Sequence, residues 1–164
     1  MGVPDACWLS PTAQVRPSPI EGLGLFAARP IAEGEPVMRL GGRVIDAAAL
    51  AALAPPYSSV ALSEGAHLLI DPAHPARYGN HGCAPNLWME GALTVVARRD
   101  IAAGEELTID YATQTGTKAW RMTCRCAAPA CRGEITGADW RLPHLQAAYG
   151  DHWTPMLLRR IRVG

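Results

Sequence analysis

Short apolar runs separated by turn-forming residues most constrain the fold of this chain. Its 164 residues include 16 glycines and 14 prolines, and most apolar runs between them are only a few residues long. Short runs bounded by Gly and Pro are typical of strands in small sheets. We therefore predict a mainly β protein. The expected strands are Pro36–Leu40, Arg43–Ile45, Val60–Leu62, His67–Ile70, Leu93–Ala97 and Leu107–Ile109.

Three stretches predict short helices. The alanine-rich stretch Asp46–Leu53 has Asp46 as its N-cap, and Pro55-Pro56 ends it. The other two helices are expected at Pro143–Tyr149 and Pro155–Arg162. Around the last helix, apolar side chains at helical spacing form a face that would pack on the core or on a second copy of the chain. These side chains are Trp153, Met156, Leu157, Leu158 and Ile161.

The charge balance argues against one broad class of function. With 15 basic and 15 acidic residues the formal net charge is zero, whereas a general nucleic-acid binder carries a basic surface. No stretch approaches the roughly 18 apolar residues of a membrane helix, so no membrane partner is expected. The segment Met1–Ser10 lacks the basic start and apolar run of a targeting signal. The expected location is cytoplasmic, where thiols stay reduced.

The cysteines cluster near the C-terminal end. Cys124, Cys126 and Cys131 fall within eight residues. Three thiols at this spacing suit one tetrahedral Zn²⁺ ion, and Cys83 is the natural donor of the fourth ligand. A disulfide or free thiols are the alternatives. Cys7 would remain outside the site.

Two further segments are rich in groups that approach ligands. In Gly22-Leu23-Gly24 the two glycines would let the backbone bend sharply and come close to a ligand, although taken alone they are better explained by a plain turn. In Arg77–Asn86, polar groups including His81 and Cys83 crowd together. Because every buried polar group needs a partner, such a cluster is hard to explain as core.

A fourth segment, Gly104–Tyr111, reads as a strand that ends in Asp110-Tyr111. It would place a phenol at the strand terminus. By itself this is also a common ending for a surface strand.

Together and in this order, the four segments resemble the motifs of SET-domain protein-lysine methyltransferases that carry a post-SET zinc-binding segment. Gly22–Phe26 is similar to the family's GxGLF element. Asn80–Asn86 is similar to its NHxCxPN motif, and Arg77-Tyr78 matches the Arg-aromatic pair before it. Gly104–Tyr111 is similar to its GEELTxDY motif, and Cys124–Cys131 to its CxCx4C segment.

The resemblance runs from about Val15 to Gly133 and implies a division of the chain. Residues 15–112 would form the SET domain, residues 120–134 the post-SET zinc-binding segment, and residues 135–164 a C-terminal helical extension. The family's fold is β-clip-like, with several short curled sheets, a few short helices and a threaded, knot-like C-terminal segment.

The resemblance also implies S-adenosylmethionine as the methyl donor, with S-adenosylhomocysteine as its product. Tyr111 would be the catalytic residue, at the point where sulfonium and amine meet. Tyr78 would pack beside the cofactor, and Trp140 would either cover the adenine or simply pack. The remaining cofactor-binding residues would be Gly22, Leu23, Gly24, Arg77, Asn80 and His81.

The implied target is a lysine side chain of a protein substrate, which would enter a channel lined by Tyr57, Ile109 and Tyr111. Tyr57 is placed there by sequence position alone. Ile109 stands where many members have Phe or Tyr, so the number of methyl groups transferred is open. The chain would act as a monomer or as a homodimer through its C-terminal helix. A catalytically silent SET module that binds protein, and a zinc-dependent regulator without the cofactor, are the alternatives.

Overall fold

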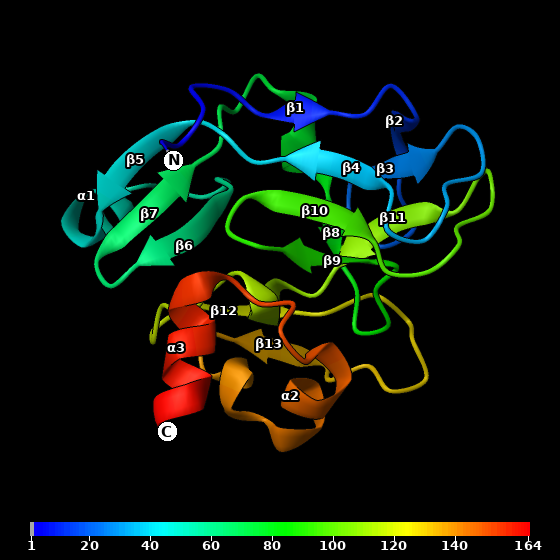
Figure 1. The fold of residues 1–164 in the computed structure, drawn as a ribbon. Helices are drawn as coiled ribbons and strands as arrows, with labels where there is room; N and C mark the ends of the chain where they lie inside the picture. Colours follow the sequence, from blue (N-terminus) through cyan, green and yellow to red (C-terminus); the bar gives the residue numbers. More distant parts are fainter. Residues whose placement is uncertain (1) are drawn as a thin grey trace.

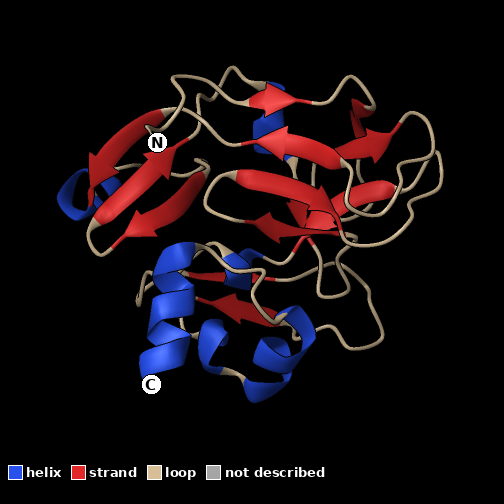
Figure 2. Ribbon diagram, viewed as in Figure 1, coloured by secondary structure: helices blue, strands red, loops and turns tan. Residues whose placement is uncertain are grey.

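The computed structural model describes residues 2–164 and confirms a mainly β architecture (Figure 1). Within these residues the strands form four small sheets, and the helices are short. Figure 2 shows three of the sheets in the upper part of the view, with the helices of the C-terminal extension below them.

The first sheet has the strand order β1-β4-β10-β9, and all of its neighbouring strands are antiparallel. Its strands are β1 (Trp8–Leu9), β4 (Pro36–Arg39), β9 (Leu87–Glu90) and β10 (Thr94–Ala97). Val37 and Met89 from this sheet are fully buried.

The second sheet, with the order β2-β3-β11-β8, carries most of the residues singled out in the sequence. Its strands are β2 (Ala13–Pro17), β3 (Leu23–Ala27), β8 (Asn80–His81) and β11 (Glu106–Ile109). The central strand β11 pairs with β3 in antiparallel and with β8 in parallel orientation. Ile109 lies opposite His81 in that parallel pair. Two motifs far apart in the sequence are therefore neighbours.

The third sheet, β5-β7-β6, carries helix α1 at one end (Figure 1). Its elements are β5 (Arg43–Asp46), α1 (Ala47–Ala51), β6 (Ser59–Ser63) and β7 (Ala66–Leu69). As predicted, Asp46 caps the helix: its carboxylate accepts a hydrogen bond from the Ala49 backbone N–H at 2.8 Å. The helix ends two residues before the expected limit of Leu53.

The C-terminal part combines a two-stranded hairpin with helices. The hairpin consists of β12 (Arg121–Thr123) and β13 (Glu134–Thr136), and the helices are α2 (Pro143–Tyr149) and α3 (Pro155–Val163). Both helices occur where the sequence predicts them. Three short 3₁₀ turns complete the described elements: η1 (Pro75–Tyr78), η2 (Tyr111–Thr113) and η3 (Asp139–Arg141).

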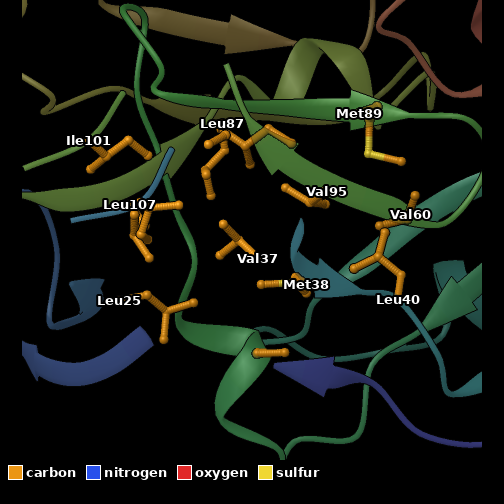
Figure 3. Packing of buried hydrophobic residues seen from close by; sticks show 14 of the residues in the cluster. Leu25, Val37, Met38, Leu40, Val60, Leu87, Met89, Val95, Ile101 and Leu107 are labelled. Atoms are coloured by element: carbon orange, nitrogen blue, oxygen red, sulfur yellow. The ribbon is translucent and has the colours of Figure 1, made fainter. Parts of the chain in front are cut away.

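Two apolar clusters hold these parts together. The main cluster lies between the first two sheets, where Figure 3 shows Leu25, Val37 and Leu107 close to one another. The second cluster contains Trp153, Met156 and Leu157 of the extension together with Ala112 of η2. The apolar face expected around α3 is thus buried within this chain, as one of its two predicted packing modes requires.

The six predicted strands are confirmed, each with small changes at its ends. The sequence does not predict the other described strands, which are β1, β2, β3, β8, β9, β12 and β13. In β2 and β12 most side chains are exposed and form no apolar run, and β1 and β8 have only two residues each. Among the described residues, no helix is long and apolar enough to cross a membrane.

Candidate functional site

Two cavities of about 480 Å³ and about 450 Å³ meet beside Tyr111. We call the first the apolar cavity, since Leu50, Val60 and Ile70 are among its lining residues. We call the second the Asn80 cavity, since Asn80 and His81 line it. Four residues line both cavities: Tyr57, Tyr111, Trp120 and Arg121.

Tyr111 is fixed at both ends. It follows β11 and begins η2, and its backbone N–H donates to Nδ1 of His81 at 3.1 Å. Its hydroxyl donates to the carbonyl oxygen of Gly79 at 2.6 Å. Burial raises the pKa of Tyr111 to about 12, so the phenol is neutral at physiological pH. With its proton directed at Gly79, the phenol oxygen keeps its lone pairs available as acceptors.

Asn80 ties the start of β3 to β11. Its side-chain Nδ2 donates to the carbonyl oxygens of Glu21 and Leu23, at 3.2 and 3.1 Å, and to the Glu106 carboxylate at 2.9 Å. A Cβ atom added at Gly24 would collide with that carboxylate and approach Asn80. Gly24 is therefore needed to make room for Asn80 and Glu106.

The Gly22–Gly24 backbone was expected to approach a ligand directly. Instead, the Asn80 cavity is lined by the residues just before it, Ile20 and Glu21. Gly22 has φ of +45°, the left-handed conformation that glycine adopts without strain, and β3 begins at Leu23. The segment thus combines a bend at Gly22 with a strand, and the two residues that precede it, Ile20 and Glu21, line the cavity.

His81 connects Tyr111 to the cysteines. Its ring is buried, and burial lowers its pKa to about 4, so it is neutral at physiological pH. Because Nδ1 accepts from the Tyr111 backbone, the ring hydrogen is assigned to Nε2. Nε2 lies 3.3 Å from Sγ of Cys83 and donates to it in this tautomer.

Cys83, Cys124, Cys126 and Cys131 form one cluster, as the sequence predicts. Their sulfur atoms all lie within 4.8 Å of one another, and Sγ of Cys83 is 3.8 Å from Sγ of Cys124. No disulfide links them. Four thiols at this separation fit the donor set of a structural zinc site. Cys7 lies elsewhere, where its thiol donates to the carbonyl oxygen of Gly41.

The thiol of Cys83, one member of this cluster, keeps its proton when no metal is bound. Burial raises the pKa of Cys83 to about 11. Because zinc binds thiolates, a metal at this site would displace that proton. The loading of the cluster is therefore expected to weaken in acid.

Trp120 is a site residue that the sequence reasoning missed. It lines both cavities, and its ring centroid lies 6.3 Å from that of Tyr111. The available signal was a large aromatic side chain in the otherwise polar stretch between Tyr111 and Cys124.

The remaining predicted site residues lie in different places relative to the two cavities. Tyr57 and Ile109 line the apolar cavity, beside Tyr111, as a channel position requires. Arg77 lines the apolar cavity and not the Asn80 cavity, and it donates to the carbonyl oxygen of Pro72 at 3.0 Å. Tyr78 lines neither cavity and packs against the main cluster.

Trp140 also lines neither cavity. It packs against the second cluster, with the guanidinium groups of Arg141 and Arg160 at 5.0 and 5.7 Å from its ring centroid. This position agrees with simple packing, one of the two roles that the sequence left open.

Comparison with known proteins places the motifs in one family. The family model described as SET domain matches residues 22–112. A histone-lysine N-methyltransferase of Schizosaccharomyces pombe, H3 lysine-4 specific, is 34% identical over an alignment of 135 residues that covers 73% of this chain and 14% of that protein. Its counterpart in Yarrowia lipolytica is 31% identical and covers 72% of this chain and 12% of that protein. The chain thus spans about a seventh or less of the length of these relatives.

Solved structures agree with the fold. The methyltransferase domain of human histone-lysine N-methyltransferase SETMAR aligns with a TM-score of 0.61 and 22% identity, over 76% of this chain and 58% of that one. KRYPTONITE, solved in complex with mCHG DNA and SAH, aligns with a TM-score of 0.58 and 25% identity, over 74% of this chain and 28% of that one.

Proposed function

The chain belongs to the SET domain family, and we propose that it is a protein-lysine methyltransferase that uses S-adenosylmethionine. One observation carries this proposal: the two cavities meet at Tyr111. Methyl transfer requires the donor and the acceptor amine to approach one point from opposite sides in line. Two cavities that share one wall provide this arrangement.

The Asn80 cavity has the features expected of the cofactor site. Its volume of about 450 Å³ is typical of small-molecule sites. Trp120 offers an aromatic face, and Glu21 and Asn80 are polar residues of the lining. A related structure holds SAH, the product form of the cofactor. When bound, S-adenosylmethionine would supply the methyl group on a positively charged sulfur.

The apolar cavity suits the hydrocarbon chain of a lysine. A free lysine amine, with a pKa of about 10.4, is neutral only about once in ~10³ molecules at neutral pH. Burial among apolar side chains such as Ile109 lowers the pKa of an amine, because the charged form loses its hydration. The phenol oxygen of Tyr111, whose own proton is held by Gly79, then accepts a hydrogen bond from the amine and orients its lone pair.

We further propose that the four-cysteine cluster binds zinc. The metal would tie residues 120–134, which carry one wall of the Asn80 cavity, to the segment of Asn80 and His81. Cys124 itself lines that cavity. The proposed role of the zinc is thus to complete the cofactor site.

The proposed location of the protein is the cytoplasm.

Labelled methyl transfer tests the function. The purified full chain is incubated with S-adenosylmethionine carrying a labelled methyl group and a host proteome, and the marked sites are identified by mass spectrometry. We expect label on lysine side chains, and far less of it with the variant Tyr111→Phe. Binding of S-adenosylmethionine without transfer to any protein would instead identify a silent SET module. Absence of binding to zinc-loaded protein would identify a regulator without cofactor.

A further inference from the structure

The residue before Tyr111 is the centre of a buried polar network. Asp110 has no exposed surface. Its carboxylate accepts two hydrogen bonds from Arg132, at 2.7 and 2.8 Å, and one from the hydroxyl of Tyr149 at 2.8 Å. The backbone N–H of Ala112 donates a fourth, at 3.0 Å. Every part of this carboxylate is therefore engaged.

Arg132 holds two carboxylates at once. Its two terminal nitrogens contact Asp110, and its Nε donates to Asp139 at 3.0 Å. This side chain is only 11% exposed. A planar guanidinium can satisfy two acceptors in this fixed fork, whereas a lysine ammonium cannot. The contact joins the segment of the cysteines to η3 and, through Asp110, to η2.

The charges of this network are stable at physiological pH. Burial by itself would raise the pKa of Asp110, but the hydrogen bonds and the positive charge of Arg132 outweigh it and hold that pKa below its ordinary value. Burial and the neighbouring Asp110 carboxylate raise the pKa of Tyr149, so its hydroxyl remains a proton donor. The Asp110 carboxylate is thus an ionised acceptor, and the Tyr149 hydroxyl is its neutral donor.

The network bears directly on the orientation of Tyr111. The Asp110 carboxylate caps η2, the turn whose first residue is Tyr111. The residues that hold this carboxylate come from far along the chain: Arg132 is 22 positions away and Tyr149 is 39 positions away. Ala112 of the same turn packs into the second apolar cluster with the extension.

We propose that Arg132 and Tyr149 are positioning residues for methyl transfer, so that residues 120–134 and the C-terminal extension together set the orientation of Tyr111 through Asp110. This inference rests on the proposed function and adds to it a role for residues 135–164. Without the Tyr149 hydroxyl, Asp110 loses one of its four donors and the turn can shift. Because small misplacements of a group that aligns reactants are costly, we expect kcat to fall about tenfold while KM for the lysine substrate stays within about twofold.

The substitution Tyr149→Phe in the full chain tests this. It keeps the ring, which packs edge-on against Trp153 with centroids 5.6 Å apart, and removes only the hydroxyl. Leu158→Ala is the matched control, because it loosens the same second cluster without touching Asp110. Arg132→Lys is a second variant, which keeps the charge and loses the fork. Each variant is measured for kcat, KM, S-adenosylmethionine affinity and hydrogen exchange of the Ala112 amide, which donates to Asp110.

The expected pattern is a lower kcat and faster Ala112 exchange in Tyr149→Phe and Arg132→Lys, with neither change in Leu158→Ala. Unchanged kcat and exchange in Tyr149→Phe would overturn the proposal, and so would an equal loss of kcat in Leu158→Ala. If the unaltered chain shows no transfer at all, the proposed function fails. The Ala112 exchange rates still decide whether Tyr149 holds the turn.

Discussion

The hydroxyl of Tyr111 donates a 2.6 Å hydrogen bond to the carbonyl oxygen of Gly79, the residue that precedes Asn80. This contact joins the end of β11 to the start of β8, the parallel pair at the heart of the site. It also decides how the phenol can act: its proton is already used, so the oxygen can serve as an acceptor.

The first prediction concerns Tyr111→Phe. The variant keeps the ring and loses the oxygen that would orient the amine, so we expect kcat to fall about 10²-fold or more, the loss typical of removing one aligned polar group. Affinity for S-adenosylmethionine, measured by calorimetry, should change by less than about threefold, a difference of under ~1 kcal/mol. A fully active variant would show that the hydroxyl has no orienting role.

The second prediction separates two tryptophans. Trp120 lines both cavities, whereas Trp140 packs under the C-terminal helices. We expect Trp120→Ala to weaken S-adenosylmethionine binding about tenfold, or ~1.4 kcal/mol. We expect Trp140→Ala to leave this affinity unchanged and to lower the free energy of unfolding by about 2 kcal/mol, as for a partly buried large side chain. Calorimetry and urea unfolding measure the two effects, and a reversed pattern would return Trp140 to the cofactor site.

The third prediction concerns the metal. Protein purified without chelator should carry about one zinc ion per chain, the stoichiometry of a four-thiol site. Cys83→Ser removes one thiol of the cluster and should lose most of the zinc, with a lower Tm. Cys7→Ser is the control, since Cys7 lies outside the cluster and should leave both values unchanged. Elemental analysis and thermal unfolding provide the readouts, and full zinc content in Cys83→Ser would exclude it as a ligand.

The sequence predicts those strands and helices whose local signals are strong. The strands β4, β7 and β10 are apolar runs bounded by turn formers, and Asp46 caps α1 as its position suggests. The strand β8 has only two residues, and it exists because β11 lies beside it. No periodicity in a two-residue segment can predict such a strand, since the pairing is a property of the whole fold.

The candidate site likewise has some features that the sequence predicts and others that it does not. The cluster of Cys83 with the three later cysteines follows from residue type and spacing, because few other arrangements use four thiols. The position of Arg77 at the apolar cavity and of Trp140 at the second cluster cannot be predicted from the sequence, because the direction in which a side chain points depends on tertiary packing. The contact of Arg132 with Asp110 is likewise an ion pair made by the tertiary fold.

The last prediction is a pH dependence, and its sign follows from the raised pKa of Tyr111, about 12 in the folded protein against about 10 for an exposed phenol. Between these values the unfolded chain releases its phenolic proton and the folded chain keeps it, so this group stabilises the fold fully below about pH 10 and the contribution is lost as the pH rises toward 12. Catalysis, in contrast, gains from alkali, because the substrate lysine must lose its proton.

We therefore expect the single-turnover rate to rise from pH 7 to about pH 10 with no decline from ionisation of Tyr111. Stopped-flow methyl transfer gives the rate, circular dichroism confirms that the protein is folded at each pH, and phenolate absorbance compared between the unaltered chain and Tyr111→Phe reports the titration of this residue. A rate that falls with a midpoint at or below about pH 10 in folded protein, together with phenolate formation that Tyr111→Phe abolishes, would show that Tyr111 titrates as an exposed phenol and is not protected by burial.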